Sequence, residues 1–456
     1  MLELIYNRKL FILLIVLHFS MGLILKFIPS LVSGIYIAVF LLFALDIIIN
    51  YDSKNRAGFY AMYIASLEIV YRMSGALFSW ELGKYLVILL FITGLIMGKR
   101  KVVPWGFLLM LLLLLPALFF VQHSNPERIR EMILFNVSGP LSLVFAGLYF
   151  YCREIDRDTF FYGLRLVFLP AFSLVSALTF LAAISTLEFS SLQSSYGASA
   201  GFGPNQVSTL LGWFLVLGLL FKIVGKKITP YEILDWVTLF VIFLRALLTF
   251  SRGGVVGALL AIVGAVVVLS ISYPFYRKIF VRSMPWVFAA LLFFAAAFVT
   301  ANEITGNYLL YRYMGYTTSE VVTGIPEAER SFLTGRGDIM KGDFAAFKDK
   351  PLLGVGYGMG ERYRSRYYWS GTAHTEFARL LSENGIPGIV FMVTGMIVLP
   401  LLFFIRMKDP VTRCFFTAFF LLSMFTMFHA AMRLALPGVV FGAAFICINS
   451  FKKEGN

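Results

Sequence analysis

Apolar runs alternate with short polar stretches along the whole chain. Fourteen runs stand out, near Leu10–Ile28, Leu31–Asn50, Ala57–Phe78, Gly83–Gly98, Val102–Val121, Met132–Cys152, Thr159–Thr186, Gln206–Val224, Ile233–Phe250, Gly253–Tyr273, Pro285–Thr300, Ile386–Ile405, Thr412–Ala430 and Leu434–Asn449. About twenty apolar residues in a helix cross the core of a bilayer, whereas barrel strands leave shorter, alternating segments. The pattern predicts an all-α polytopic membrane protein with about 14 transmembrane helices, or about 12 if two short neighbouring runs, such as the first two, form re-entrant hairpins.

One polar interruption, Ala301–Gly385, is much longer than a connection between spans requires. Loops of this length usually carry function or fold by themselves. We therefore divide the chain into an N-terminal transmembrane bundle (residues 1–300), a catalytic loop (301–385) and a C-terminal part with the last spans and a tail (386–456).

Two short helices are predicted inside this long loop. Asp338–Lys350 carries apolar residues at near-helical spacing and is stopped by Pro351. We expect it to lie on the membrane surface or on the bundle of spans. Thr372–Asn384 is the second predicted helix, with Gly385 at its C-terminal end, and this places His374 in its first turn.

Composition agrees with a membrane protein, and charge orients it. Of the 456 residues, 59% are hydrophobic and 14% are charged, and the mean hydropathy is +0.82. The net charge is +14, but no basic stripe with interleaved aromatic residues indicates nucleic-acid binding. The positive-inside rule places the cation-rich loops and both termini in the cytoplasm and the long loop on the opposite side. Cations occupy every second loop: Arg8, Lys9, Lys54, Arg56, Lys99, Arg100, Lys101, Arg153, Arg157, Lys226, Lys227, Arg277, Lys278, Arg282, Arg406, Lys408, Arg413, Lys452 and Lys453.

The cysteines and the search for metal-binding motifs indicate neither an external disulfide nor a metal site. Cys152, Cys414 and Cys447 fall near predicted cytoplasmic helix ends, so no external disulfide is expected. The first apolar run follows Arg8 and Lys9 without an obvious cleavage site, which favours an uncleaved first span. No HExxH or paired CxxC motif is present. We expect a metal-independent site and no cofactor.

Ionisable residues at the outer ends of spans are candidates for chemistry, because charge is costly in a membrane. Arg245 and Arg252 are seven residues apart and would lie about two turns apart on one helix face, where they could bind a polyanion at two depths. Alternatively, Arg252 extends to the interface and Arg245 pairs with a buried carboxylate. His429 and Arg433 flank the last outer turn and suit either substrate binding or packing.

Another pair, Glu68 and Arg72, has the i, i+4 spacing of mutual neutralisation, and we favour that reading. His374 is the strongest single candidate, since a helix N-terminus and nearby arginines, among them Arg379, would favour the neutral imidazole that a general base needs. An ordinary exposed histidine is the alternative. Gly354–Gly360 resembles a phosphate-binding loop, but it lacks the lysine-serine ending and a preceding strand.

Several motifs in order resemble the O-antigen ligase and O-antigen polymerase superfamily of bacterial envelopes. They are Ser251-Arg252-Gly253, Thr334-Gly335-Arg336, the run from Pro351 to Gly358, and His374 followed by Glu383-Asn-Gly-Ile-Pro-Gly388. The likeness covers roughly the half of the chain after Gly201. Family members often carry an arginine in the glycine-rich loop that is Tyr196–Asn205 here, and this chain has none. Either Arg245 or another arginine supplies that charge, or the donor is held differently.

This resemblance implies a GT-C-type glycosyltransferase of the bacterial inner membrane. It would use an undecaprenyl-diphosphate-linked glycan at the periplasmic face and transfer it to lipid A-core, as ligases do, or to a second lipid-linked repeat unit, as polymerases do. By matching motifs, Arg252, Arg336 and His374 inherit diphosphate binding and catalysis. We expect Arg336 and His374 to fold over Arg252. Substrate-binding candidates are Arg245, Arg379, Arg433, His429 and Asn205.

A transporter of lipid-linked sugars is the alternative from another class. In that case the arginines would bind substrate and no bond would be cleaved. Internal symmetry between halves would favour transport, and the sequence shows none. A large polar loop on one side favours chemistry at one face of the membrane.

Overall fold

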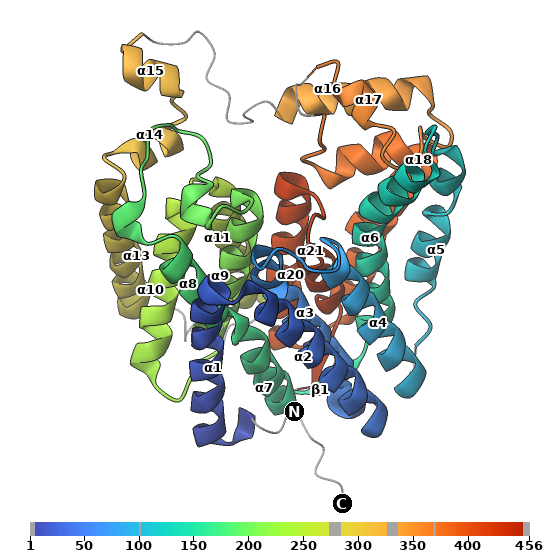
Figure 1. Cartoon of the computed structure of the whole chain (residues 1–456). Coiled ribbons are helices and arrows are strands. Elements are labelled where there is room, and N and C mark those ends of the chain that lie inside the picture. Colours follow the sequence, from blue (N-terminus) through green and yellow to red (C-terminus); the bar gives the residue numbers. More distant parts are fainter. Residues whose placement is uncertain (1–4, 100–101, 273–283, 326–335, 368–370, 450–456) are drawn as a thin grey trace, which may run out of the picture.

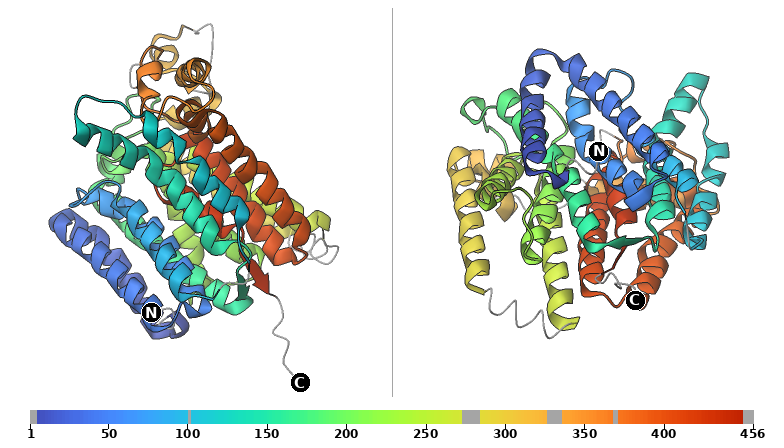
Figure 2. Two further views of the ribbon diagram at one scale, coloured as in Figure 1. Left: turned by 90° about the vertical axis from the view of Figure 1, so that its right-hand side faces the viewer. Right: turned by 90° about the horizontal axis from the view of Figure 1, so that it is seen from below.

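A computed structural model describes residues 5–99, 102–272, 284–325, 336–367 and 371–449. The helices form one bundle, and the first and last described residues lie at the same end of it (Figures 1 and 2). In the N-terminal half the helices are α1 (Arg8–Phe27), α2 (Pro29–Ile49), α3 (Arg56–Met73), α4 (Leu82–Met97), α5 (Trp105–Leu113), α6 (Pro126–Phe150), α7 (Arg157–Phe168), α8 (Pro170–Leu181) and α9 (Pro204–Ile223). The later ones are α10 (Glu232–Leu248), α11 (Arg252–Ser272), α13 (Met284–Ile304), α14 (Tyr308–Met314), α15 (Thr318–Thr323), α16 (Arg336–Asp349), α17 (Glu361–Arg364), α18 (Glu376–Val393), α19 (Leu399–Arg406), α20 (Pro410–Ala430) and α21 (Leu436–Ala443).

Every predicted apolar run contains helix, which confirms the all-α membrane class. Among the described residues, eight helices are long and apolar enough to cross a membrane, and three shorter apolar helices accompany them. Other runs form helices that are more polar or shorter, such as α3 with its buried Glu68 and Arg72, or the eight-residue α21. The count of about 14 spans and the GT-C type stay predictions.

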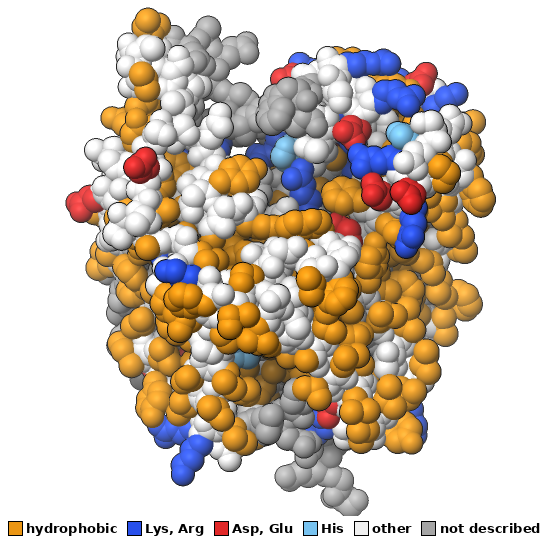
Figure 3. Space-filling view, viewed as in Figure 1, with side chains coloured by type: hydrophobic (Ala, Val, Ile, Leu, Met, Phe, Trp, Pro, Cys, Tyr) orange, Lys and Arg blue, Asp and Glu red, His pale blue; other side chains and the backbone are white. Residues whose placement is uncertain are grey.

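A broad belt of apolar side chains surrounds the middle of the bundle, with charged side chains gathered above and below it (Figure 3). Leu13, Val16 and Leu41, on α1 and α2, are among the large apolar residues with more than half of their surface exposed. Exposed apolar surface on this scale is stable when lipid covers it. The belt therefore agrees with a bundle that spans a membrane.

The end with both chain termini carries the predicted cation-rich loops. Arg153 Nη1 donates to Asp52 Oδ2 at 2.8 Å, and Lys226 forms a 3.3 Å ion pair with Asp158. Beside them β1 (Glu154–Asp156) and β2 (Cys447–Asn449) form a two-stranded parallel sheet. Contacts among these loops show that they share one end, as the charge alternation predicts. Arg100, Lys101, Arg277, Lys278, Arg282, Lys452 and Lys453 lie outside the described residues.

The opposite end is covered by the long loop, whose helices α14 to α18 lie above the bundle (Figure 1). The predicted helix over Asp338–Lys350 is confirmed as α16, which buries Ile339, Asp343 and Ala346. The predicted helix over Thr372–Asn384 begins later, at Glu376, because Thr375 has extended backbone angles and acts as the N-cap residue. His374 therefore precedes the helix, and its placement in the first turn was wrong.

Candidate active site

The connection between α10 and α11 places Arg252 at the base of the long loop. The chain turns at residues 249–251, where Phe250 has a positive φ of 56°. Arg245 is thus on α10 and Arg252 begins α11, so the prediction that both lie on one helix face was wrong. Arg245 is 4% exposed, and its Nη1 donates to the carbonyl oxygen of Ala182 at 2.8 Å. The structure thus gives Arg245 a backbone carbonyl as its partner. A buried carboxylate was one of the expectations.

His429 on α20 joins Arg336 of the long loop to the turn before Arg252. Arg336 Nη2 lies 3.1 Å from His429 Nδ1, and His429 Nε2 lies 3.3 Å from Ser251 Oγ. Because an arginine can only donate, Nδ1 accepts, so the neutral ring carries its proton on Nε2 and donates to Ser251. Ser251 Oγ in turn donates to Asn205 Oδ1 at 2.8 Å.

Gly253 makes this arrangement possible. A Cβ atom at this position would lie 1.9 Å from the ring of His429, which is far inside contact distance. The glycine after Arg252 is therefore required by the close approach of α11 to α20. This explains the glycine of the Ser-Arg-Gly motif in terms of packing.

A third arginine, Arg312 on α14, belongs to the same cluster and was missed by the sequence analysis. Arg252 Nη1 donates to the carbonyl oxygen of Arg312 at 3.3 Å. Burial and the positive charges of Arg252 and Arg336 lower the pKa of Arg312 to about 10. Three arginines thus lie close enough to repel one another, an arrangement that suits a polyanionic ligand. The only sign of Arg312 in the sequence is that it is a cation within the aromatic run 308–316.

His374 is half-buried next to this cluster. Its Nδ1 atom is buried and has no hydrogen-bond partner. Burial, followed by the charges of Arg433, Arg336 and Arg364, lowers the pKa of His374 to about 4. The neutral imidazole agrees with the prediction, but its causes are burial and arginines outside α18, not a position in the first turn of that helix. The structure therefore brings Arg336, His374 and Arg252 into one neighbourhood, and their chemical roles stay predictions.

The buried Arg364 and the partly buried Arg433 hold the segment that carries His374. Arg433 Nη2 donates to the carbonyl oxygen of Ala373 at 3.0 Å. Arg364 Nε donates to the carbonyl oxygen of Gly371 at 2.7 Å, and its Nη1 donates to Asp343 on α16 at 2.7 Å. Arg433 thereby has a positioning contact with the histidine loop, whatever its contact with substrate.

Arg379 on α18 is tied to carboxylates. It forms ion pairs with Glu376 and, at 3.2 Å, with Glu383. It also donates to the side chain of Asn136 on α6 at 3.0 Å. With two carboxylates beside it, its charge is largely compensated, and its clearest role is to fix α18 against α6.

The glycine-rich run Gly354–Gly360 braces α18. The backbone N–H groups of Val355 and Gly356 donate at 3.0 Å to the carbonyl oxygens of Ser382 and Glu383. A phosphate cradle needs such N–H groups to be available, and these two already have partners. The run is therefore a structural clasp.

The predicted pairing of Glu68 with Arg72 is confirmed at 2.5 Å. Glu68 also accepts from the backbone N–H of Ala435 at 2.8 Å, and Arg72 donates to the carbonyl oxygen of Arg433 at 2.9 Å. The pair consequently holds the turn between α20 and α21 that bears Arg433.

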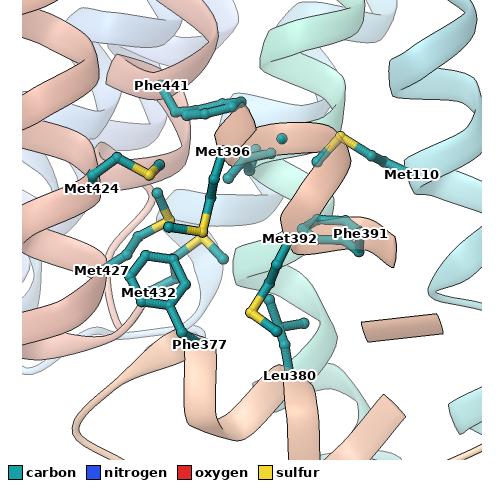
Figure 4. Close-up of a pocket in the computed structure, with 12 residues that line it drawn as sticks. Met110, Phe377, Leu380, Phe391, Met392, Met396, Met424, Met427, Met432 and Phe441 are labelled. Atoms are coloured by element: carbon teal, nitrogen blue, oxygen red, sulfur yellow. The ribbon is translucent and has the colours of Figure 1, made fainter. Parts of the chain in front are cut away.

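Below this polar layer lies a small apolar pocket of about 20 Å³, lined by phenylalanine and methionine side chains (Figure 4). Phe377 and Leu380, one turn apart on α18, point into it. This volume is about that of one water molecule, so the pocket is a packing defect under the site. Methionine side chains adapt readily to such irregular space.

The matched family covers the centre of this site. Among the described residues, no three His, Cys, Asp or Glu side chains form a metal-binding group. Thr334 and Gly335 of the arginine motif lie outside the described residues. No curated protein matches the chain. Residues 237–393 match the family described as O-antigen ligase, and this region contains Arg252, Arg336 and His374. The predicted resemblance is confirmed over these residues, which are similar to the O-antigen ligase family and consistent with the O-antigen ligase and polymerase superfamily.

Proposed function

We propose that the chain is a metal-independent glycosyltransferase that moves a glycan from undecaprenyl diphosphate to an acceptor hydroxyl at the periplasmic face of the bacterial inner membrane. The observation that carries this proposal is the convergence of Arg252, Arg312 and Arg336 beside His374 at the end of the bundle opposite the termini. Arginines bind diphosphate through paired N–H groups and need no metal to do so.

The reaction requires the protein to stabilise the leaving group and to accept a proton from the acceptor hydroxyl. The acceptor oxygen attacks C1 of the donor sugar, the bond between C1 and the diphosphate oxygen breaks, and undecaprenyl diphosphate leaves with the negative charge. The arginine cluster stabilises that charge as it develops. His374, neutral because of its surroundings, takes the proton from the attacking hydroxyl.

Ligase and polymerase reactions share this step and differ in the acceptor. A ligase uses lipid A-core, and a polymerase uses a second lipid-linked repeat unit. We favour the ligase assignment, with the polymerase as the alternative. Loss of the gene separates them: bare core with accumulating lipid-linked chains indicates a ligase, and single repeat units on the core indicate a polymerase.

The test uses purified protein with labelled undecaprenyl-diphosphate glycan and each acceptor. We expect wild-type protein to release undecaprenyl diphosphate, and Arg336→Met, Arg252→Met and His374→Ala to lower kcat/KM by about 100-fold or more. The matched control is Arg366→Met, because Arg366 is an exposed arginine of the same loop that packs on Tyr363. Normal transfer by the first three variants contradicts the assignment of these residues. If wild-type protein released no undecaprenyl diphosphate with any acceptor, the transporter alternative would be favoured.

A further inference from the structure

We propose that a polar cavity beside His374 binds the sugar rings of the acceptor glycan, an inference that rests on the proposed glycosyl transfer. The cavity has a volume of about 720 Å³. It is bounded by residues 78–85, which run from the connection after α3 into the first turn of α4, by the first half of α6, by residues 371–373 of the long loop and by residues 431–433. Its volume is in the range of sites that enclose small molecules.

Among the buried polar atoms of the residues that line the cavity, both donors and acceptors lack a hydrogen-bond partner. Glu81 Oε1 and Gln206 Oε1 are acceptors without a hydrogen bond, and Arg72 Nε is a donor without one. Glu81 is 7% exposed and Arg72 5%. Buried polar atoms rarely stay unpaired in folded proteins, so these residues of the wall have hydrogen-bonding capacity that the protein itself does not use. A sugar hydroxyl both donates and accepts, and it matches such a mixed set.

Aromatic rings form another part of the wall. Phe78 and Trp80 line the cavity although 67% and 52% of their surfaces are exposed. The Trp80 ring stacks on Phe202 with centroids 6.0 Å apart, which holds the indole in place. Flat apolar faces of this kind pack against the C–H face of a sugar ring, while the polar atoms reach its hydroxyls.

Charge separates this cavity from the arginine cluster. Most of its cations face carboxylates: Lys84 pairs with Glu81, Arg72 with Glu68 and Arg379 with Glu376, whereas Arg433 donates to a backbone carbonyl. Beneath α16 to α18, acidic and basic side chains lie beside one another on the face seen in Figure 3. A diphosphate would meet these carboxylates, whereas an uncharged glycan would not. The donor diphosphate therefore belongs at the arginine cluster.

His374 lies between the two regions. Thr372 and Ala373 line the cavity, and Arg433, also in its wall, donates to the Ala373 carbonyl oxygen. Arg336 of the arginine cluster also lies close enough to His374 to act on its charge. An acceptor in the cavity would present a hydroxyl to the imidazole, while donor C1 approaches from the arginines.

The test measures the two substrates separately with purified full-length protein, labelled undecaprenyl-diphosphate glycan and isolated acceptor glycolipid. We expect Trp80→Ala and Gln206→Ala to raise the KM for the acceptor by about 10-fold, and to leave unchanged both the KM for the donor and the slow release of undecaprenyl diphosphate to water. Trp105→Ala is the matched control, since Trp105 is 74% exposed and lies outside the cavity wall. Thermal unfolding of each variant verifies folding, and Gln206→Ala tests the proposal if Trp80→Ala does not fold.

Two results would overturn the proposal. A raised donor KM with an unchanged acceptor KM would assign the cavity to the glycan of the donor. Unchanged values for both substrates would show that the cavity binds no sugar. Failure of the proposed function looks different, because wild-type protein would then transfer no glycan to any acceptor.

Discussion

The imidazole of His374 meets cations from three separate parts of the chain. Arg336 comes from α16, Arg364 from α17 and Arg433 from the turn after α20. Their combined charge, added to burial, disfavours the imidazolium form. The side chain is thus prepared as a base by residues that are far from it in sequence.

This predicts an unusual pH profile. Because the pKa of His374 is lowered to about 4, from 6.5 for an ordinary histidine, the neutral base is present above about pH 4 and is lost as pH falls through that value. The pH dependence of kcat/KM reports the free enzyme, so its acidic limb should lie well below pH 6.5. Arg433→Met removes one cation and should move the limb to higher pH, whereas Arg433→Lys keeps the charge and should not. A wild-type limb at the ordinary histidine pKa would contradict this.

Residue identity alone was a partial guide to the site. Arg252, Arg336 and His374 stand in recognisable motifs, so they could be singled out. Arg312 stands in none, and Arg379 carries a charge that Glu376 and Glu383 largely compensate in the folded chain. Motifs record which residue types occur in order, whereas the availability of a charge depends on its folded neighbours.

Among the elements, α18 is the one on which the histidine loop depends. Its backbone departs from helical angles at Gly385, with φ +61° and ψ −137°. A Cβ atom at Gly385 would lie 2.5 Å from the backbone nitrogen of Gly354 and 2.5 Å from the carbonyl oxygen of Pro351. Both the backbone angles and the space require glycine at this position.

Gly385→Ala should therefore destabilise the protein by roughly 1–3 kcal/mol or more, because it adds backbone strain and a clash with the glycine-rich clasp. The measurement is thermal unfolding in detergent, together with transfer activity. Gly34→Ala on α2 is the control, since no atom lies within 4 Å of its added methyl group. It should be neutral or slightly stabilising. Equal melting temperatures for the two variants would contradict the role of Gly354–Gly360 as a clasp on α18.

The sequence predicted helices correctly where the helical spacing of apolar residues is sustained, but it misplaced a helix end. The spacing of apolar residues located α16 to within two residues at each end. The start of α18 was misplaced because Thr375 takes the N-cap position, a choice that depends on how the preceding loop is held by Arg364 and Arg433. Local pattern contains no information about such anchoring.

At the end of the bundle away from the site, the buried ion pair of Arg153 with Asp52 holds helices together. Arg153 and Asp52 are 8% and 4% exposed. Asp52 also accepts from the hydroxyl of Tyr149 at 2.8 Å and from the backbone N–H of Ala57 at 2.9 Å. The pair thus joins the ends of α2, α3 and α6.

Arg153→Met should lower the free energy of unfolding by about 3–5 kcal/mol, because it leaves a buried carboxylate unpaired. Transfer activity of the protein that remains folded should stay normal, since the arginine cluster lies at the opposite end. Lys226→Met is the control: its ion pair with Asp158 is 39% and 75% exposed and should be worth about 0–1 kcal/mol. Unfolding measurements on both variants, with activity in parallel, decide the matter. A specific loss of activity from Arg153→Met at unchanged stability would be inconsistent with a purely structural role.

The sequence by itself determined the membrane class, the position of nearly every helix, the gathering of the cation-rich loops at one end and the family resemblance. These properties depend on segments taken singly, through hydropathy, charge and short motifs, so they can be read without the fold. Only the tertiary structure decided that Arg312 joins Arg252 and Arg336, that Arg245 is on another helix than Arg252 and binds a backbone carbonyl, and that His374 owes its neutral form to burial and to arginines of other elements. The cavity beside His374 was likewise decided there. Such features arise when segments tens to hundreds of residues apart pack together, and proximity in space sets both pKa and access.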